Sequence, residues 1–252
     1  MITYLLAFFL AFSAPVFAAG GETAKPHAPM GGWSFDGPLG TFDRHQLQRG
    51  FQVYKQVCAA CHSLHLVSYR HLQALGFSEA EVKAIAAEYT VKDGPNDEGE
   101  MFDRPALPSD RFASPYANNN AARAANNGAL PPDLSLMAKA RAGGPDYIYS
   151  LLTGYQQPPA DAHMMDGMNY NPYMSGGQIA MPAPLSENAV TYADNTPATV
   201  EQMSQDVSAF LMWAAEPKME ERKRMGVMVL MFLVAFAFIM YGAKKAVWRN
   251  KH

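Results

Sequence analysis

Cys58-Ala59-Ala60-Cys61-His62 is the stretch of sequence from which the rest of the chain can be interpreted. It contains both cysteines of the 252-residue chain and places a histidine directly after the second. C-x-x-C-H is the pattern of covalent c-type haem attachment, in which two thiols form thioether bonds to the porphyrin and the adjacent imidazole ligates the iron. The motif therefore predicts one haem c, held by Cys58 and Cys61, with His62 as an iron ligand.

Three other interpretations of the cysteine pair are weaker. A zinc site needs about four ligands, and without further cysteines the others would have to be scattered histidines such as His65 or His71. A thioredoxin-like redox pair belongs to a strand-helix-strand pattern that the surrounding sequence lacks. A structural disulfide between cysteines so close in sequence would remove little entropy from the unfolded chain.

Residues 1–18 have the features of an export signal. They contain no charged side chain, are apolar from Tyr4 to Phe12, and end in the small-x-small pattern Val16-Phe17-Ala18. An uncleaved membrane anchor is the alternative, but the apolar run is short for a span, which needs about 20 residues. We therefore expect residues 1–18 to be removed as a signal peptide after export.

A second apolar segment lies near the other end of the chain. Residues 226–243 contain no charge, and as a helix they would be about 27 Å long, enough to cross the hydrocarbon of a bilayer. Basic clusters at both ends disfavour the alternative of a buried core helix. Because the final flank is basic without acids, we expect residues 218–243 to anchor the chain in the inner (cell) membrane, with the tail 244–252 in the cytoplasm and the preceding domain in the periplasm.

Residues 19–217 form the expected haem domain, and they are acidic. The whole chain has a net charge of −3, of which residues 218–224 contribute +2 and the tail +4, so that this part carries −9. An acidic surface repels nucleic acid and increases the rate of encounter with basic proteins. We therefore expect basic protein partners and no nucleic-acid partner.

Three helices can be predicted in this domain from their first residues. Thr41 can cap a helix that runs into Cys58. Ser78 and Glu81 have the spacing of a capping box, and Thr196-Pro197 can open a third helix. The apolar residues that follow each start recur at helical intervals, so we interpret them as core residues.

The connections between the expected helices are long and irregular. Residues 92–120 and 154–195 are rich in Pro, Gly, Asn and Asp with little alternation, which predicts loops rather than strands. Loops of this length in a compact domain usually wrap a cofactor or dock a partner. The predicted fold class is therefore mainly α, a cytochrome-c-like haem domain with long irregular loops and one C-terminal transmembrane helix.

An electron-carrying haem iron needs a second axial ligand, and methionine opposite histidine raises the reduction potential. The chain has 16 methionines. Met181 is attractive because it lies in Gly176-Gly177-Gln178-Ile179-Ala180-Met181-Pro182-Ala183-Pro184, where apolar neighbours and rigid prolines can hold a thioether away from water. Physics alone leaves four other loop methionines open, namely Met164, Met165, Met168 and Met174.

Several longer motifs accompany the cysteine motif. They are Arg49-Gly50-Phe51-Gln52-Val53-Tyr54-Lys55-Gln56-Val57-Cys58, Tyr69-Arg70-His71-Leu72, Asp93-Gly94-Pro95-Asn96, Ala124-Ala125-Asn126-Asn127-Gly128-Ala129-Leu130-Pro131-Pro132-Asp133-Leu134-Ser135, Leu151-Leu152-Thr153-Gly154-Tyr155 and Trp213-Ala214-Ala215-Glu216-Pro217. By these motifs and C-x-x-C-H, the chain from about Trp33 to the membrane span resembles the cytochrome c1 family, which carries the haem of the cytochrome bc1 complex.

The resemblance assigns roles to individual residues. It implies that His62 and Met181 are the proximal and distal iron ligands and that Arg141 lies near the haem propionates, where a guanidinium suits a carboxylate. It also implies that Asn126 and the Pro131-Pro132 turn wall the haem crevice. The complete set of residues expected to bind the haem is Cys58, Cys61, His62, Met181, Arg141, Asn126 and Pro132.

The resemblance also implies a function. The chain would be a membrane-anchored monohaem cytochrome that passes single electrons from a Rieske iron–sulfur subunit to a soluble basic cytochrome c. It would do so beside cytochrome b in a dimeric bc1 complex, and it would not be an enzyme on its own. Two alternatives are a free-standing membrane-anchored cytochrome that feeds a terminal oxidase and a haem-based sensor, which would need an exchangeable distal position.

An acidic segment offers a candidate docking surface. Residues 93–103 contain five acids and no base. The segment is either a solvated loop or a patch that steers a basic soluble cytochrome c or a basic partner subunit, in which case its charges set the association rate more than the affinity.

Overall fold

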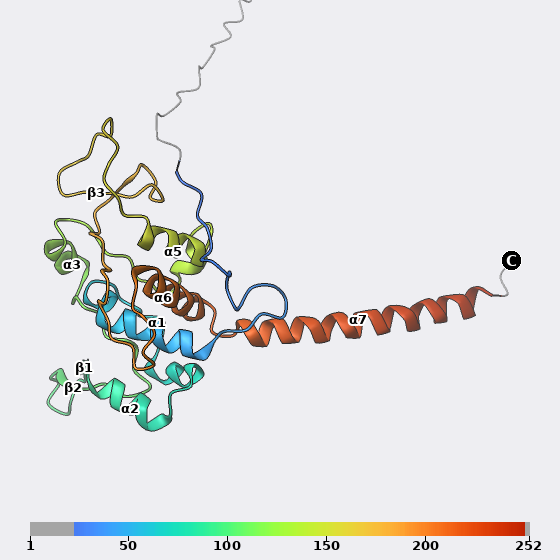
Figure 1. Cartoon of the computed structure of the whole chain (residues 1–252). Helices are drawn as coiled ribbons and strands as arrows, with labels where there is room; N and C mark the ends of the chain where they lie inside the picture. The colour runs from blue at the N-terminus through green and yellow to red at the C-terminus, as the bar shows by residue number, and fades with distance from the viewer. Residues whose placement is uncertain (1–22, 250–252) are drawn as a thin grey trace, which may run out of the picture.

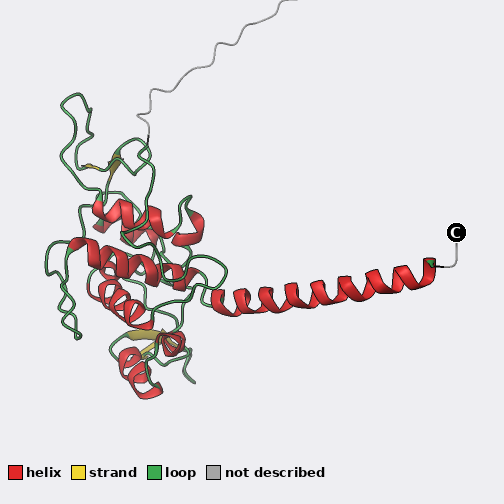
Figure 2. Ribbon diagram, turned by 45° about the vertical axis from the view of Figure 1, so that its right-hand side comes forward, coloured by secondary structure: helices red, strands yellow, loops and turns green. Residues whose placement is uncertain are grey.

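The computed structural model describes residues 23–249 and is mainly helical with little strand, which confirms the predicted fold class (Figures 1 and 2). Residues 1–18, predicted to be an export signal, lie outside the described residues. The elements in chain order are α1 (Arg44–Gln56), η1 (Cys58–Ala60), η2 (Tyr69–Leu75), α2 (Glu79–Ala87), β1 (Thr90–Asp93), β2 (Phe102–Pro105), α3 (Asn119–Ala125), α4 (Met137–Ala140), α5 (Pro145–Thr153), β3 (Asn169–Tyr170), β4 (Gln178–Ile179), α6 (Val200–Ala215) and α7 (Met219–Trp248).

Helices α1 and α6 form the centre of the domain and pack against each other (Figure 1). They approach closely at Gly50, where an added Cβ would lie only 2.0 Å from the carbonyl oxygen of Asp206. The rings of Phe51 and Phe210 are buried beside this crossing, with their centroids 5.8 Å apart. Because α1 ends just before Cys58, the crossing fixes the position of the cysteine motif.

The first helix starts two residues later than predicted. Asp43, not Thr41, caps α1, and its carboxylate accepts hydrogen bonds from the backbone N–H of His45 at 2.9 Å and of the next residue at 3.3 Å. A carboxylate that satisfies two free N–H groups is a strong cap. The capping box of α2 is confirmed, because Ser78 Oγ accepts from Glu81 N–H and the Glu81 carboxylate accepts from Ser78 N–H.

The third predicted helix also starts later. Helix α6 begins at Val200, and its cap is Thr199, whose Oγ1 accepts a hydrogen bond from Gln202 N–H at 3.1 Å. Thr196-Pro197 lies before the helix, so the prediction of this helix was right and its start was wrong. Met203 is fully buried on α6, which confirms its interpretation as a core residue.

The segments predicted as loops contain two short antiparallel hairpins that the sequence did not indicate. β1 pairs with β2 through four residues on each strand, and β3 pairs with β4 through two residues on each strand. The absence of alternation misled the prediction because the strands are short, and because β1 and β2 are also largely exposed. Helix α3 also begins inside residues 92–120.

The first hairpin pairs part of the acidic segment with basic residues just outside it. Arg104 binds the carboxylate of Asp93 across the hairpin and also that of Asp110, with an Nη1–Oδ2 distance of 2.6 Å. Lys92 Nζ lies 3.1 Å from Asp103 Oδ1. Two of the five acids in residues 93–103 are therefore in ion pairs, and the exposed acids Asp97, Glu98 and Glu100 lie in the connection between the strands.

Helix α7 leaves the domain as a single projecting rod (Figure 1). Its most apolar 18-residue stretch has a mean hydropathy of 2.3 and is not buried against the rest of the chain. Among the described residues this is the one helix long and apolar enough to cross a membrane. The helix continues to Trp248, beyond the predicted span, and it serves as the single-pass anchor of the chain.

Candidate haem site

The cysteine motif forms a tight turn at the end of α1. Val57 ends the helix, and Cys58 begins the short 3-10 turn η1. The backbone N–H groups of Cys61 and His62 both donate to the carbonyl oxygen of Cys58, at 3.1 and 2.9 Å. The turn therefore keeps the two thiols and the imidazole on one short, hydrogen-bonded piece of backbone.

The ring of His62 is oriented by a backbone carbonyl from a distant part of the chain. Nδ1 lies 2.8 Å from the carbonyl oxygen of Pro132. A carbonyl oxygen only accepts, so Nδ1 carries the proton and Nε2 keeps its lone pair, as a metal-binding histidine requires. Burial lowers the pKa of His62, although the bond to Pro132 acts in the opposite direction. The imidazole is therefore neutral at pH 7 and suited to ligate iron.

The Cys58 thiol differs from the thiol of a redox-active or metal-binding cysteine. Burial raises the pKa of the Cys58 thiol to about 12, and the neighbouring Cys61 acts in the same direction. Redox-active and metal-binding cysteines have a lowered pKa instead.

A short strap, residues 131–135, fastens the Pro132 carbonyl to the residues after the motif. Leu134 N–H donates to the carbonyl oxygen of Ser63 at 2.9 Å, and Leu66 N–H donates to Ser135 Oγ at 3.0 Å. These bonds hold two segments together that are about 70 residues apart in sequence. The strap is thus the part of the fold that keeps the His62 ring in place.

Asp133 is the central residue of the strap, and the sequence pattern alone did not predict a role for it. One carboxylate oxygen accepts from Ser63 Oγ at 2.7 Å and His65 N–H at 2.9 Å, and lies 2.6 Å from His65 Nδ1. The other accepts from Ser135 N–H at 2.9 Å. Burial opposes ionisation of Asp133, but these hydrogen bonds outweigh it and lower its pKa to about 2. The Asp-x-Ser spacing, which is typical of a local side-chain turn, was the available signal.

We expect Asp133→Asn to loosen the strap. An amide cannot accept all of these hydrogen bonds, and an unsatisfied buried donor costs about 1–3 kcal/mol. Thermal unfolding of the purified protein, followed at the haem absorbance, should then show a midpoint lowered by roughly 2–4 °C for each kcal/mol. Asp161→Asn, at an exposed loop acid, is the control. Equal midpoints for the two variants would contradict the role of Asp133.

Met181 follows β4 and is held by its backbone. Its carbonyl oxygen accepts from Tyr155 Oη at 3.1 Å and from the side-chain amide of Asn169 at 3.4 Å. The residue is half-buried, and Ile179 before it is buried. These contacts fix the loop at Met181, and the role of its thioether as an iron ligand stays a prediction from the sequence.

The remaining predicted site residues differ in where they lie. Pro132 contacts His62 through its backbone carbonyl oxygen. Asn126 ends α3, where its amide donates to Tyr116 Oη at 3.1 Å and to Ala122 O at 2.7 Å. Arg141 is exposed at the end of α4, and its guanidinium donates to the carbonyl of the preceding residue at 3.3 Å. The contacts of Asn126 and Arg141 are therefore local, and their haem roles stay predictions.

Comparison with known proteins gives evidence about the family of the chain that does not depend on this geometry. Residues 33–251 match the model of the Cytochrome C1 family. "Cytochrome c1 1, heme protein, mitochondrial" of Arabidopsis thaliana is 53% identical over 238 residues, which cover 94% of this chain and 76% of that protein. "Cytochrome c1" of Rhodospirillum rubrum is 48% identical over 237 residues, 87% of each chain.

A longer relative also matches. "Cytochrome b/c1" of Bradyrhizobium diazoefficiens is 49% identical over 246 residues, which cover 89% of this chain and 36% of that protein. The family match extends over most of the chain, including the cysteine motif, the strap and the projecting helix. The chain therefore belongs to the cytochrome c1 family.

Proposed function

We propose that the chain carries one haem c, bound through thioethers to Cys58 and Cys61, with His62 and Met181 as iron ligands. The observation that carries this proposal is the hydrogen bond from His62 Nδ1 to Pro132, which leaves Nε2 free as a ligand inside a C-x-x-C-H turn. The haem supplies one-electron redox chemistry when bound. Arg141, Asn126 and Pro132 are proposed to line its crevice, and Arg141 is proposed to pair with the propionates.

As a cytochrome c1, the chain is an electron-transfer subunit of the bc1 complex. We propose that it accepts one electron at a time from the Rieske subunit and gives it to a soluble basic cytochrome c. It breaks no substrate bond, so it acts as part of a quinol-oxidising complex and not as an enzyme alone. The name of the Bradyrhizobium relative, which joins b and c1, supports cytochrome b as a neighbour, and the complex is proposed to be dimeric.

The proposed topology follows the same order as the chain. Residues 1–18 act as the export signal, and residues 19–217 form the periplasmic haem domain. Residues 218–243 anchor it as part of α7, and the basic tail 244–252 lies in the cytoplasm, in keeping with the positive-inside rule. This orientation places the haem domain on the side from which a periplasmic cytochrome c can reach it.

Covalent attachment is tested by removing both thiols. We expect Cys58→Ala/Cys61→Ala to abolish haem staining of the denatured chain on a gel, because no thioether can then form. His71→Ala, at a histidine outside the motif, is the control and should keep the stain. The wild-type protein should purify with cytochrome b and a Rieske protein. A colourless wild-type chain from haem-replete cells would disprove the cofactor, and purification without both partners would favour a free-standing cytochrome.

The soluble acceptor is tested at the exposed acids of the hairpin connection. We expect Asp97→Asn/Glu98→Gln/Glu100→Gln to slow the reduction of a basic soluble cytochrome c at low salt and to flatten its salt dependence, because steering by surface charge weakens with ionic strength. Stopped-flow absorbance measures this rate.

The control for this variant removes the same number of negative charges elsewhere. Asp161→Asn/Glu79→Gln/Glu201→Gln changes three exposed acids outside the hairpin and away from α7. If both triple variants slow the reaction equally, only net charge matters and the hairpin is not the docking surface. An unchanged rate in the hairpin variant at low salt would exclude it as well.

A further inference from the structure

A closed loop, residues 34–41, lies against the start of α7. The N–H of Thr41 donates to the carbonyl oxygen of Ser34 at 3.1 Å, which ties the two ends of the loop together. Gly40 has no room for a side chain, since an added Cβ would lie 2.0 Å from Asp36 O. The ammonium of Lys223 on α7 donates to the carbonyl oxygens of Phe35 and Gly40. The loop is therefore compact and fastened to the helix.

A second pair of contacts fixes the base of the loop. The carboxylate of Glu220, in the first turn of α7, accepts from Phe42 N–H at 2.7 Å and pairs with Arg44 Nη2 at 2.7 Å. Met219 is buried in the domain core beside them. The position of the loop along the axis of α7 is thus determined by the domain and by the helix together.

The tip of the loop is apolar and lies beside the start of the charge-free run. Leu39 is 78% exposed, and together with Pro38 it lines a groove whose other wall includes Val227, Met228 and Met231 of α7. These three residues belong to the uncharged segment 226–243. Because that segment spans the membrane, the loop tip lies at the depth where the hydrocarbon begins.

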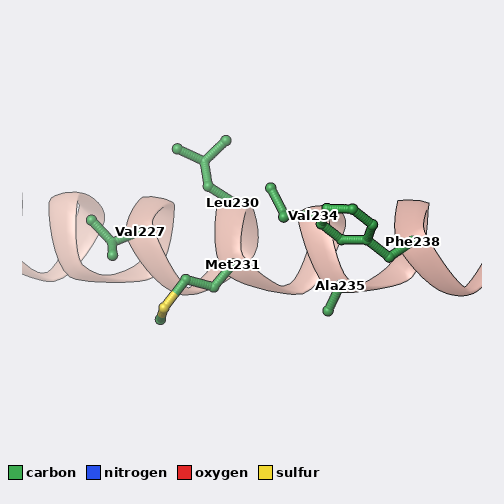
Figure 3. A pocket seen from close by; sticks show the side chains of 6 residues that line it. All are labelled: Val227, Leu230, Met231, Val234, Ala235 and Phe238. Atoms are coloured by element: carbon green, nitrogen blue, oxygen red, sulfur yellow. The ribbon is translucent and has the colours of Figure 1, made fainter.

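The groove continues along one face of the helix. Val227 and Met231 also line an open hollow whose side chains are all apolar, as Figure 3 shows. Its other members are Leu230, Val234, Ala235 and Phe238. The spacing of three and four residues places all six on one side of α7.

The other end of the groove is lined by charged side chains of α7. They are Glu220, whose carboxylate is paired with Arg44, and the basic residues Lys223 and Arg224. The Lys223 ammonium already binds the loop, whereas Arg224 is exposed. A guanidinium at the end of an apolar channel matches a phospholipid, whose phosphate is anionic and whose acyl chains are apolar.

We propose that the 34–41 loop and the first turns of α7 form a binding site for an anionic phospholipid, with its phosphate at Arg224 and an acyl chain along the apolar face. Leu39 then enters the interface as a second membrane contact of the domain. A tightly packed partner helix is the other occupant to consider. Such helices favour small residues at their contact, and this face presents mainly Val, Leu, Met and Phe.

The depth of the loop is tested with a nitroxide label on Leu39→Cys in the complete complex, reconstituted in vesicles of phosphatidylcholine and phosphatidylglycerol. Collisions with oxygen, which concentrates in the bilayer, or with a water-soluble nickel chelate increase the electron spin relaxation rate of the label. We expect oxygen to increase this rate more than the nickel chelate does. A label on Met30→Cys, at a 99% exposed residue of the same N-terminal segment, should show the reverse order. The unsubstituted complex treated with the same reagent gives the background.

Two results of this measurement would overturn the proposal. Relaxation of the Leu39 label mainly by the nickel chelate would place the loop in water. Relaxation by neither reagent would place the loop against another protein subunit, in which case the groove holds a partner helix and not a lipid.

The phosphate contact is tested separately with spin-labelled phosphatidylglycerol. We expect Arg224→Gln to reduce the motionally restricted fraction of this lipid, because the guanidinium that binds its phosphate is gone. Lys218→Gln removes the same charge at an exposed residue outside the groove and should leave that fraction unchanged. An equal fraction in wild type and Arg224→Gln would overturn the assignment, and an equal loss in both variants would reduce it to general attraction by basic charge.

Discussion

Met181→Leu is expected to remove methionine ligation while the domain stays folded. Leucine is close to methionine in volume, and such exchanges in a core usually cost less than about 1.5 kcal/mol. Without the thioether, the long-wavelength charge-transfer absorption of the oxidised haem should be lost and the reduced haem should bind carbon monoxide. The reduction potential should fall by roughly 0.1 V or more, within the range of about 0.8 V that axial ligands control.

The structure makes this substitution a selective one. Tyr155 and Asn169 hold the carbonyl oxygen of Met181 and do not depend on its side chain. The loop should therefore keep its path in the leucine variant, and a change in the spectrum can be attributed to the missing sulfur. Equilibrium redox titration and carbon monoxide binding, both followed by visible absorbance, measure the effect.

Two other loop methionines serve as controls. Met165 is 62% exposed, so Met165→Leu should leave the spectrum and the potential unchanged. Met174 is the stronger rival, because its sulfur lies 3.7 Å from Tyr147 Oη and is held in the fold. If Met174→Leu loses the charge-transfer band and Met181→Leu keeps it, the ligand has been assigned to the wrong methionine.

The cysteine motif and the helices could be predicted because their signals are local. C-x-x-C-H is a single piece of backbone, and a capping box such as Ser78 and Glu81 spans one helical turn. The predicted starts of α1 and α6 were wrong by a few residues because a nearer side chain, Asp43 or Thr199, caps the helix instead. Patterns of three to four residues identify a helix more reliably than they identify its first residue.

The contacts that the sequence did not reveal join distant segments. Asp133 contacts residues that are about 70 positions earlier in the chain, and its role depends on where the fold brings the strap. Arg104 neutralises Asp93 only because a hairpin of weak strand character places them side by side. Counting the charges only within residues 93–103 therefore overstated the free negative charge of that segment, because its basic partners lie just outside it.

The crossing of α1 and α6 connects the core to the haem motif and can be tested at one residue. On an exposed helix, Gly→Ala would stabilise by about 1 kcal/mol. At Gly50 the new Cβ would lie 2.0 Å from Asp206 O and 2.7 Å from Phe210 Cβ, so the two helices would have to separate. Overpacking of this kind typically costs about 1–3 kcal/mol and occasionally more.

Separation of the helices would also stretch an ion pair beside the crossing. Arg49 Nε lies 2.9 Å from a carboxylate oxygen of Asp206, whose side chain is fully buried. Weakening a buried pair leaves a charge without its partner and adds to the cost. The steric clash and the weakened ion pair both lower the free energy of unfolding. Together they exceed the stabilisation that comes from the higher helix propensity of alanine.

We therefore expect Gly50→Ala to destabilise the haem domain by about 2 kcal/mol or more, which corresponds to a midpoint lowered by roughly 4–8 °C or more for a domain of this size. Thermal unfolding of the purified complex, followed by circular dichroism in the haem absorption band, measures this change. Gly226→Ala is the matched control, because a Cβ at that position of α7 meets nothing within 4 Å, so its midpoint should not fall below that of wild type. Equal midpoints for both variants would show that the close approach of α1 and α6 does not constrain the segment that carries Cys58.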